Sequence, residues 1–141
     1  MSSNVIPGMH YHDAPAAIEW LCNVLGFEKH AVYPGPGPNE IMHAELTLSG
    51  TGMIMIGSNR KDTPYGKLTV HPDDIGGAEC RSVSLIVPDA DTIYARAKAA
   101  QAPMVFDIED KPYGGRGFTC RDPEGYMWHI GTYNPWTAPK P

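Results

Sequence analysis

The sequence predicts a single α+β domain (residues 1–141) built from two copies of one βαβββ module. Its length suffices for one domain with a buried core. The order of predicted elements restarts after residues 59–79, a charged stretch with prolines, glycines and no periodicity, which we interpret as a linker. At a shift of about 75 residues, Asp13-Ala14 falls on Asp89-Ala90 and residues 54–58 fall on residues 128–132. A repeat this long indicates a duplicated module rather than a solenoid.

The first module covers residues 4–58 and contains one helix, from about Pro15 to Leu25. Asp13 or Ala14 lies at the helix cap, and Gly26 follows the last turn, as helix ends favour. Apolar residues recur at helical spacing, so one side of this helix is expected to face the core. The strands predicted around it are residues 5–12, 27–33, 41–49 and 53–58.

The second module covers residues 80–133 and repeats this order. Its helix is capped by Asp89-Ala90-Asp91 and reaches about Gln101. Asp122-Pro123-Glu124-Gly125 is expected to form a tight turn between the last two strands, because Pro and Gly suit such turns. A tail, residues 134–141, follows the module. The predicted strands are residues 81–88, 104–108, 117–121 and 126–133.

Composition excludes several classes of partner. A formal net charge of −5 without a Lys/Arg cluster argues against nucleic acid. No apolar run approaches the roughly 20 residues that cross a bilayer, so no membrane partner is expected. The N-terminus lacks the pattern of a secretory signal, and we therefore expect a cytoplasmic protein. The cysteines Cys22, Cys80 and Cys120 form no CxxC pair, so we expect reduced thiols, with Cys120 in the sheet interior.

Two segments resemble a known family. Residues 11–18, followed by Leu25-Gly26-Phe27-Glu28, look like the first module of the glyoxalase, bleomycin-resistance and extradiol-dioxygenase (vicinal oxygen chelate) superfamily. Residues 118–125 resemble its last hairpin, where an Asp-Pro-x-Gly turn is habitual. The resemblance covers roughly Val5 to Tyr133, and it places the chain in the glyoxalase-like branch of bacterial proteins.

This resemblance implies two modules whose mixed sheets form a cup, and commonly a homodimer. In the enzymes of the superfamily, a divalent metal in the cup chelates two neighbouring oxygens of the substrate. In the antibiotic-resistance members there is no metal, and the cup or the dimer crevice sequesters a drug. The fold alone therefore leaves the function open.

The four positions that hold the metal in the enzymes can be carried onto this sequence. Counting by the family spacing from Asp13 and Asp89, they are Ile6, Met55, Ser82 and His129. Of these, His129 alone binds a hard or borderline cation well, because Ile has no donor, Met is a soft thioether and neutral Ser is a poor ligand. The usual metal site is therefore predicted to be missing.

Strand alternation indicates a second set of candidates. His10 has the parity of Ile6, and His43 and Glu45 alternate with apolar residues in their strand, so all three are expected on the cup side. With His129 they can be read as a displaced site for Zn, Fe, Mn or Ni. We favour the other interpretation, in which they are polar residues that line a wet pocket, and His12 is expected to be a surface histidine.

The loop before the 117–121 strand supplies another candidate, Arg116. Its guanidinium can clamp an acidic ligand, or it can pair with an acidic neighbour such as Asp107 or Glu109. In the tail, Trp136 can cover the cup or the dimer seam, or anchor the tail.

These observations predict a metal-free, homodimeric small-molecule-binding protein of the bleomycin-resistance type. It would sequester a small, partly planar ligand in the cup through His10, His43, Glu45, Arg116 and His129, without a cofactor. The alternative is a metal-dependent glyoxalase-like lyase, isomerase or dioxygenase that uses the displaced cluster.

Overall fold

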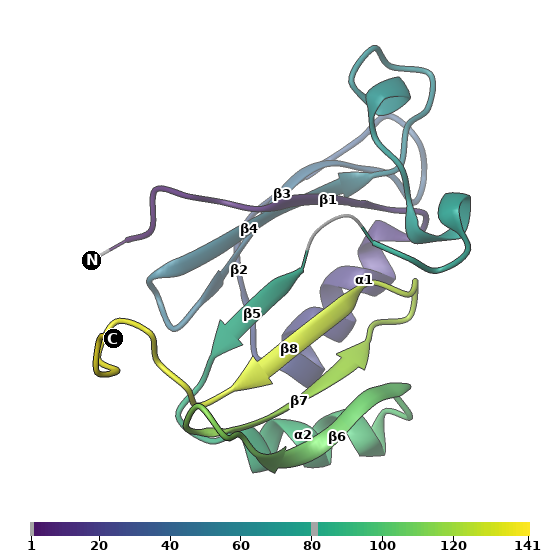
Figure 1. Cartoon of the computed structure of the whole chain (residues 1–141). Helices are drawn as coiled ribbons and strands as arrows, with labels where there is room; N and C mark the ends of the chain where they lie inside the picture. The colour runs from purple at the N-terminus through teal and green to yellow at the C-terminus, as the bar shows by residue number, and fades with distance from the viewer. Residues whose placement is uncertain (1, 80–81) are drawn as a thin grey trace. The chain divides into compact units, whose positions relative to one another are not determined.

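Each half of the chain folds around its own four-stranded mixed sheet, with the same strand order in both (Figure 1). The computed structural model describes residues 2–79 and 82–141. Its contacts separate the chain into two compact units, Met1–Ala78 (unit 1) and Glu79–Pro141 (unit 2). Cys80 and the start of the strand predicted at Arg81 lie outside the described residues. The predicted α+β class is confirmed.

In unit 1 the sheet order is β1-β4-β3-β2, with β1 and β4 parallel and the other neighbours antiparallel. Two short 3-10 helices lie in the stretch that the sequence predicted as a linker. The elements are β1 (Gly8–Tyr11), α1 (Ala14–Trp20), the π-helical turn η1 (Leu21–Leu25), β2 (Glu28–Pro34), β3 (Ile41–Leu48), β4 (Gly52–Ser58), η2 (Gly66–Leu68) and η3 (Pro72–Ile75).

Unit 2 repeats the plan with the order β5-β8-β7-β6, in which β5 and β8 are parallel. The elements are β5 (Val83–Ile86), α2 (Ala90–Ala99), β6 (Met104–Asp110), β7 (Arg116–Arg121) and β8 (Met127–Gly131). Each unit thus places the first strand of its module beside the last one. A parallel pair of this kind needs a connection that crosses the sheet, and the helix is part of that connection.

The helix starts are capped as the sequence predicts. The Asp13 carboxylate accepts the Ala16 N–H at 3.1 Å. In unit 2, the Asp89 carboxylate accepts the Thr92 N–H at 3.2 Å and the Thr92 hydroxyl at 2.6 Å, and these hydrogen bonds lower the pKa of Asp89. The first helix does not run as a regular α-helix to its end, because its last turn is π-helical before the left-handed Gly26.

One face of each sheet is buried and carries the core. In unit 1 the alternate strand residues on that face and the inner side of α1 and η1 are buried; they are Met9, Tyr11, Ala44, Leu46, Ile54, Ile56, Ala14, Ala17, Ile18, Leu21, Val24 and Leu25. In unit 2 the corresponding buried residues are Leu85, Phe118, Cys120, Trp128, Ile130, Ala90, Ile93 and Ala97. The strand predicted from Val5 begins only at Gly8, and Val5 itself is 77% exposed.

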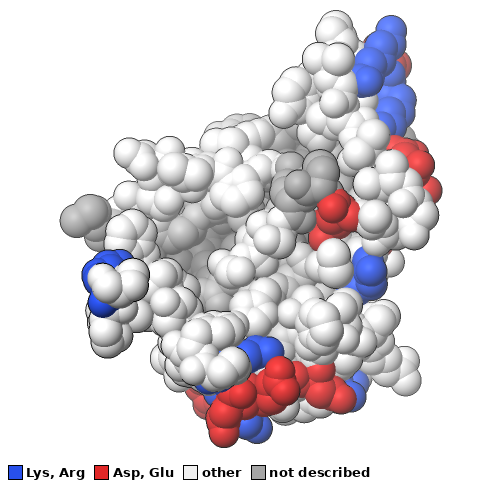
Figure 2. Space-filling model, viewed as in Figure 1, with Lys and Arg blue, Asp and Glu red and all other residues white. Residues whose placement is uncertain are grey.

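The outer edge of sheet 2 is acidic. The edge strand β6 carries Asp107, Glu109 and Asp110, all largely exposed, and Figure 2 shows acidic side chains gathered along this part of unit 2. Charges on an edge strand hinder pairing with the edge of another sheet. Within residues 2–79 and 82–141, no helix combines the length and apolar character needed to cross a membrane.

The predicted turn between β7 and β8 is organised by one buried carboxylate. The Oδ1 atom of Asp122 accepts the N–H groups of Glu124 at 3.0 Å and Tyr126 at 3.1 Å. Its Oδ2 atom accepts the indole N–H of Trp128 at 3.0 Å. The same side chain therefore closes the turn and fixes the large aromatic residue at the centre of unit 2.

We predict that Asp122→Ala destabilises the chain by about 3 kcal/mol, because it leaves three N–H donors without their acceptor. Asp122→Asn should lose about 1 kcal/mol, since one amide oxygen can still accept hydrogen bonds at the turn. Urea unfolding of the full chain measures both changes. Equal losses for the two variants would show that the negative charge, rather than the acceptor geometry, stabilises the turn.

Candidate functional site

In unit 1, the sheet face opposite the buried core carries the predicted polar residues. Met55 on β4 pairs with Gly8 on one side and Glu45 on the other. Two residues further along the strands, His10 pairs with Gly57, and His43 pairs with Tyr33. We call this the open face of sheet 1. The prediction from alternation holds for this sheet, because His43 and Glu45 are part-exposed while Ala44 and Leu46 are buried.

Two of these residues form a direct contact. His43 Nε2 lies 3.0 Å from Glu45 Oε2, and the Tyr33 ring stacks against His43 with a centroid distance of 6.0 Å. His10 has a different ring neighbour, Tyr65, at 6.0 Å. The metal-binding atoms of His10, His43 and Glu45 do not all lie within 4.8 Å of one another. Among the described residues, one other group of three side chains meets this criterion. Unit 1 therefore presents a polar pair and a separate histidine on this face.

In unit 2 the open face centres on His129. Its Nδ1 atom lies 3.0 Å from the Thr119 hydroxyl, which comes from the neighbouring strand. Gly117 and Gly131 pair beside it, and a Cβ on either glycine would lie 3.3 Å from the imidazole ring. The two glycines therefore leave the space that the ring occupies. Phe106, opposite Thr119 on β6, extends this row with an aromatic ring that is 62% exposed.

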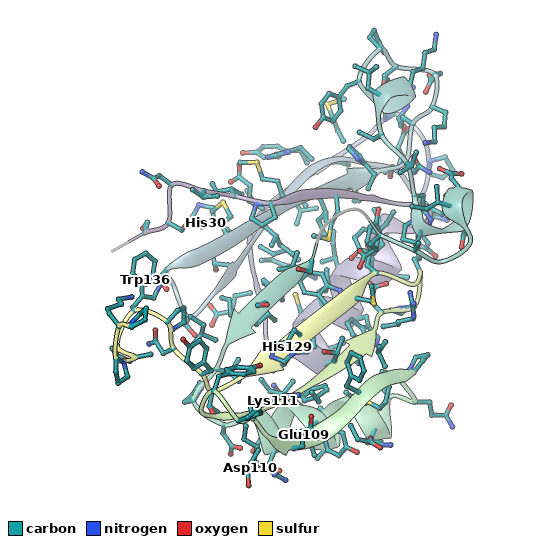
Figure 3. The ribbon with its side chains drawn as sticks, in the orientation of Figure 1. His30, Glu109, Asp110, Lys111, His129 and Trp136 are labelled. Carbon is teal, nitrogen blue, oxygen red and sulfur yellow. The ribbon has the colours of Figure 1, made fainter. Side chains whose placement is uncertain are left out.

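Lys111, which was not predicted from the sequence, belongs to the same face. Lys111 follows β6, and its side chain is only 12% exposed although it carries an ammonium group. Nζ lies 3.0 Å from Glu109 Oε1, and Figure 3 shows Lys111 between Glu109 and His129. Burial lowers the pKa of His129, and the nearby Lys111 charge lowers it further. The open face of sheet 2 thus includes the Lys111 ammonium, a neutral imidazole and a hydroxyl.

Arg116 does not lie where we predicted a ligand clamp. On β7 it shares the side of the buried Phe118, and its Nε atom lies 3.0 Å from Asp91 Oδ2. A second carboxylate, Asp110, lies 3.4 Å from its Nη1 atom. Arg116 therefore forms salt bridges, as in the alternative prediction, but with Asp91 and Asp110 rather than with Asp107 or Glu109. We therefore remove Arg116 from the set of candidate ligand-binding residues.

The remaining predictions concern the cysteines and the tail. Cys120 is buried in the sheet interior as predicted, and burial raises its pKa to about 12, which makes it a poor nucleophile. Cys22 is part-buried, and burial also raises its pKa. Both are free thiols. Trp136 is 85% exposed, and its backbone N–H donates to Asn134 Oδ1.

The positions that hold a metal in enzymes of the resembled family lack a suitable donor set. The structure places Gly8, not Ile6, level with Met55, and Ser84, not Ser82, level with His129. This correction adds no ligand, because glycine has no side chain and a neutral hydroxyl binds metals weakly. With either assignment, His129 is the single good donor. The residues present do not fit the metal of the family.

A repeated βαβββ plan with a polar open face on each sheet agrees with one sequence family. The profile of the Glyoxalase/Bleomycin resistance protein/Dioxygenase superfamily matches residues 9–130. The chain belongs to this superfamily. The predicted membership is therefore confirmed, and the region matched includes both sheets.

Solved structures agree with the assignment. TioX from Micromonospora sp. ML1 is 34% identical, with a TM-score of 0.70 over 94% of this chain and 100% of that chain. Lactoylglutathione lyase from Agrobacterium tumefaciens is 20% identical, with a TM-score of 0.60 over 93% of each chain, and shows the shared fold alone. The uncharacterized protein Rv0887c of Mycobacterium tuberculosis is 29% identical over 137 residues, 93% of this chain and 77% of that protein.

The lowered pKa of His129 leads to a pH prediction. Because the pKa in the folded chain lies below the ordinary value of 6.5, protons bind more readily to the unfolded chain. The contribution of His129 to stability is therefore complete above pH 6.5 and is lost as the pH falls through its folded pKa. NMR titration of the histidine rings should show this depressed pKa.

Lys111→Met should raise the pKa of His129 while leaving it below the ordinary value, because burial is the larger cause. Lys98→Met is the matched control, since Lys98 is an exposed residue of α2 that pairs with Asp107. An unchanged His129 titration in Lys111→Met would show that the ammonium does not act on this ring.

Proposed function

We propose that this protein is a metal-free small-molecule-binding protein of the bleomycin-resistance type. The observation that carries the proposal is the donor set at the family's metal positions, where His129 is the single good ligand. The open faces supply what ligand binding needs instead, namely apolar and aromatic surface beside a few polar groups. We further propose that the protein acts as a cytoplasmic homodimer.

The ligand we propose is small, partly planar and acidic. Phe106 offers an exposed ring for a flat molecule, and His129 and Thr119 offer hydrogen-bonding groups in the same row. Lys111 supplies the positive charge that we first assigned to Arg116. Its partner Glu109 is 65% exposed, so this ion pair is weak and an anionic ligand can replace it.

A pair of dyes tests this proposal. Anilinonaphthalene sulfonate is planar and anionic, and phenylnaphthylamine is its uncharged analogue. Both should bind with increased fluorescence. Lys111→Met should weaken binding of the sulfonate dye about tenfold, equivalent to about 1.4 kcal/mol, and leave the neutral dye unaffected. Lys98→Met should change neither affinity. Failure of both dyes to bind would contradict a binding site for planar molecules.

Dialysis against EDTA separates the metal-free proposal from the metal-dependent alternative. Dye binding should survive the treatment unchanged. The alternative is favoured by a specific contact, the His43–Glu45 pair, which can act as a ligand pair or as a general base. Loss of binding in EDTA, recovery with Zn, Fe, Mn or Ni, and no recovery in a His43→Ala, Glu45→Gln variant would overturn the proposal.

A further inference from the structure

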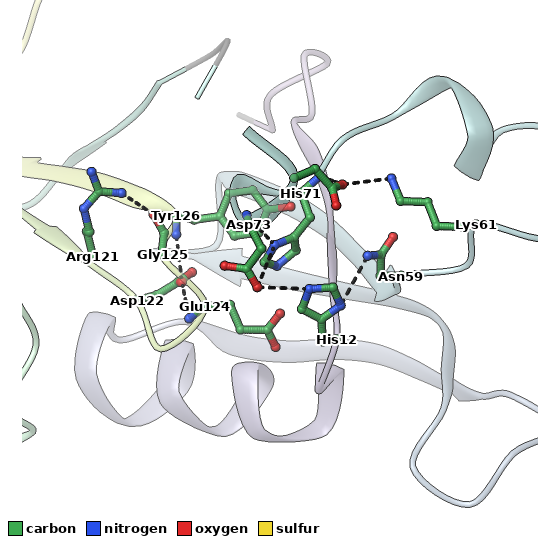
Figure 4. A network of polar contacts seen from close by, with 11 residues as sticks. His12, Asn59, Lys61, His71, Asp73, Arg121, Asp122, Glu124, Gly125 and Tyr126 are labelled. Carbon is green, nitrogen blue, oxygen red and sulfur yellow. Dashed lines mark hydrogen bonds and ion pairs between the residues drawn. The ribbon is translucent and has the colours of Figure 1, made fainter. Parts of the chain in front are cut away.

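A cluster of three donor residues lies outside the open faces, within unit 1. His12 follows β1, while His71 and Asp73 lie at the start of η3. His12 Nε2 is 3.3 Å from Asp73 Oδ2, and His71 Nδ1 is 3.7 Å from the same oxygen (Figure 4). Among the described residues, this is the one group of three His, Cys, Asp or Glu side chains whose donor atoms all lie within 4.8 Å.

We propose that His12, His71 and Asp73 form a binding site for a divalent transition-metal ion such as Zn²⁺ or Ni²⁺. Two imidazole nitrogens and one carboxylate oxygen suit these ions rather than Ca²⁺ or Mg²⁺, which prefer oxygen ligands. Donors at about 2.0–2.1 Å from a tetrahedral ion lie about 3.3–3.4 Å from one another. The two measured separations are close to that spacing, so His12 and Asp73, whose side chains are at least half exposed, need to move only slightly.

The neighbours of the cluster orient the two rings. The Asn59 side-chain amide contacts His12 Nδ1 at 3.3 Å, and an amide can turn to offer its oxygen to a protonated Nδ1, which leaves Nε2 to bind the ion. His71 is buried, and its Nδ1 accepts the Asp73 N–H at 3.1 Å, so this nitrogen is already unprotonated. An ion bound at His71 Nδ1 would replace the hydrogen bond from the Asp73 N–H, so metal binding would change the first turn of η3.

The adjacent carboxylate has a separate role. Asp74 Oδ2 accepts the His71 backbone N–H at 2.8 Å and lies 3.1 Å from Lys61 Nζ. These contacts hold the backbone at His71 and leave Asp73 as the carboxylate of the cluster. Three protein donors leave at least one coordination position for water, as in zinc sites that remain open. None of the three donors occupies a position that the family uses for its metal.

Calorimetric titration of chelator-treated full-length protein with ZnCl₂ tests the site. We expect about one ion per chain, and a loss of affinity of about tenfold or more in His12→Gln and in Asp73→Asn. Both side chains are at least half exposed, so these variants should fold, which circular dichroism verifies. His30→Gln is the matched control, because it removes one exposed histidine outside the cluster and outside the open faces, and it should bind as the wild type.

Three results of the same titration would overturn the inference. The first is that the wild type shows no saturable binding, and the second is that the cluster and control variants lose affinity equally. The third is that binding survives in the His12→Gln, Asp73→Asn double variant. Dye binding in the double variant should be unchanged. The metal site can therefore fail while the proposed binding function holds, and the reverse is also true.

Discussion

One helix covers one face of each four-stranded sheet, and this constraint places the candidate residues of the strands on the opposite face. The covered face is filled by alternate residues of the strands, such as Leu46 in unit 1 and Phe118 in unit 2. Strand geometry then places the intervening residues on the open face. The alternation that buries their neighbours in the strands therefore leaves His43, Glu45 and His129 accessible to ligands. A one-residue slip in register would exchange the two faces, so burial of the core face also fixes which residues lie on the open face.

In unit 2 a second constraint keeps that register. The Asp122 carboxylate accepts N–H groups from the turn and from Trp128, so it joins the hairpin to the core. The hairpin strands hold Thr119 opposite His129 and Gly117 opposite Gly131. The space over the two glycines, and the imidazole that fills it, therefore depend on a turn at the far end of the strands. A residue without any ligand contact thus helps to shape the open face.

Local patterns predicted much of this arrangement. Caps, helical spacing and period-two alternation gave the helix starts, the strands and the position of His43 and Glu45 on the open face of sheet 1. The same alternation, applied to Phe118 and Cys120, would have placed Arg116 on the covered side, but Arg116 was assigned to the loop before the strand rather than to the strand itself. Lys111 could not be predicted, because its position depends on a side chain that folds back over the sheet.

The contact between His12 and His71 had no local signal either. Residues 59–79 show no periodicity, so nothing in that stretch indicated which of its side chains would return to the end of β1. The structure brings the two rings to a centroid distance of 3.9 Å, with Asp73 beside both. The three converging donors of unit 1 thus lie beyond the end of its edge strand β1, whereas the family position on its open face is occupied by Met55.

The charge on the open face of sheet 2 follows from the state of its histidine. Burial and the Lys111 ammonium both lower the pKa of His129, so the ring is neutral at pH 7 and Lys111 carries the positive charge beside it. A neutral imidazole has one donor and one acceptor nitrogen. If the Thr119 hydroxyl donates to Nδ1, Nε2 carries the proton and donates to a ligand; if Nδ1 donates to Thr119, Nε2 accepts. Thr119 therefore determines which hydrogen-bonding group His129 presents, while Lys111 favours a negatively charged ligand.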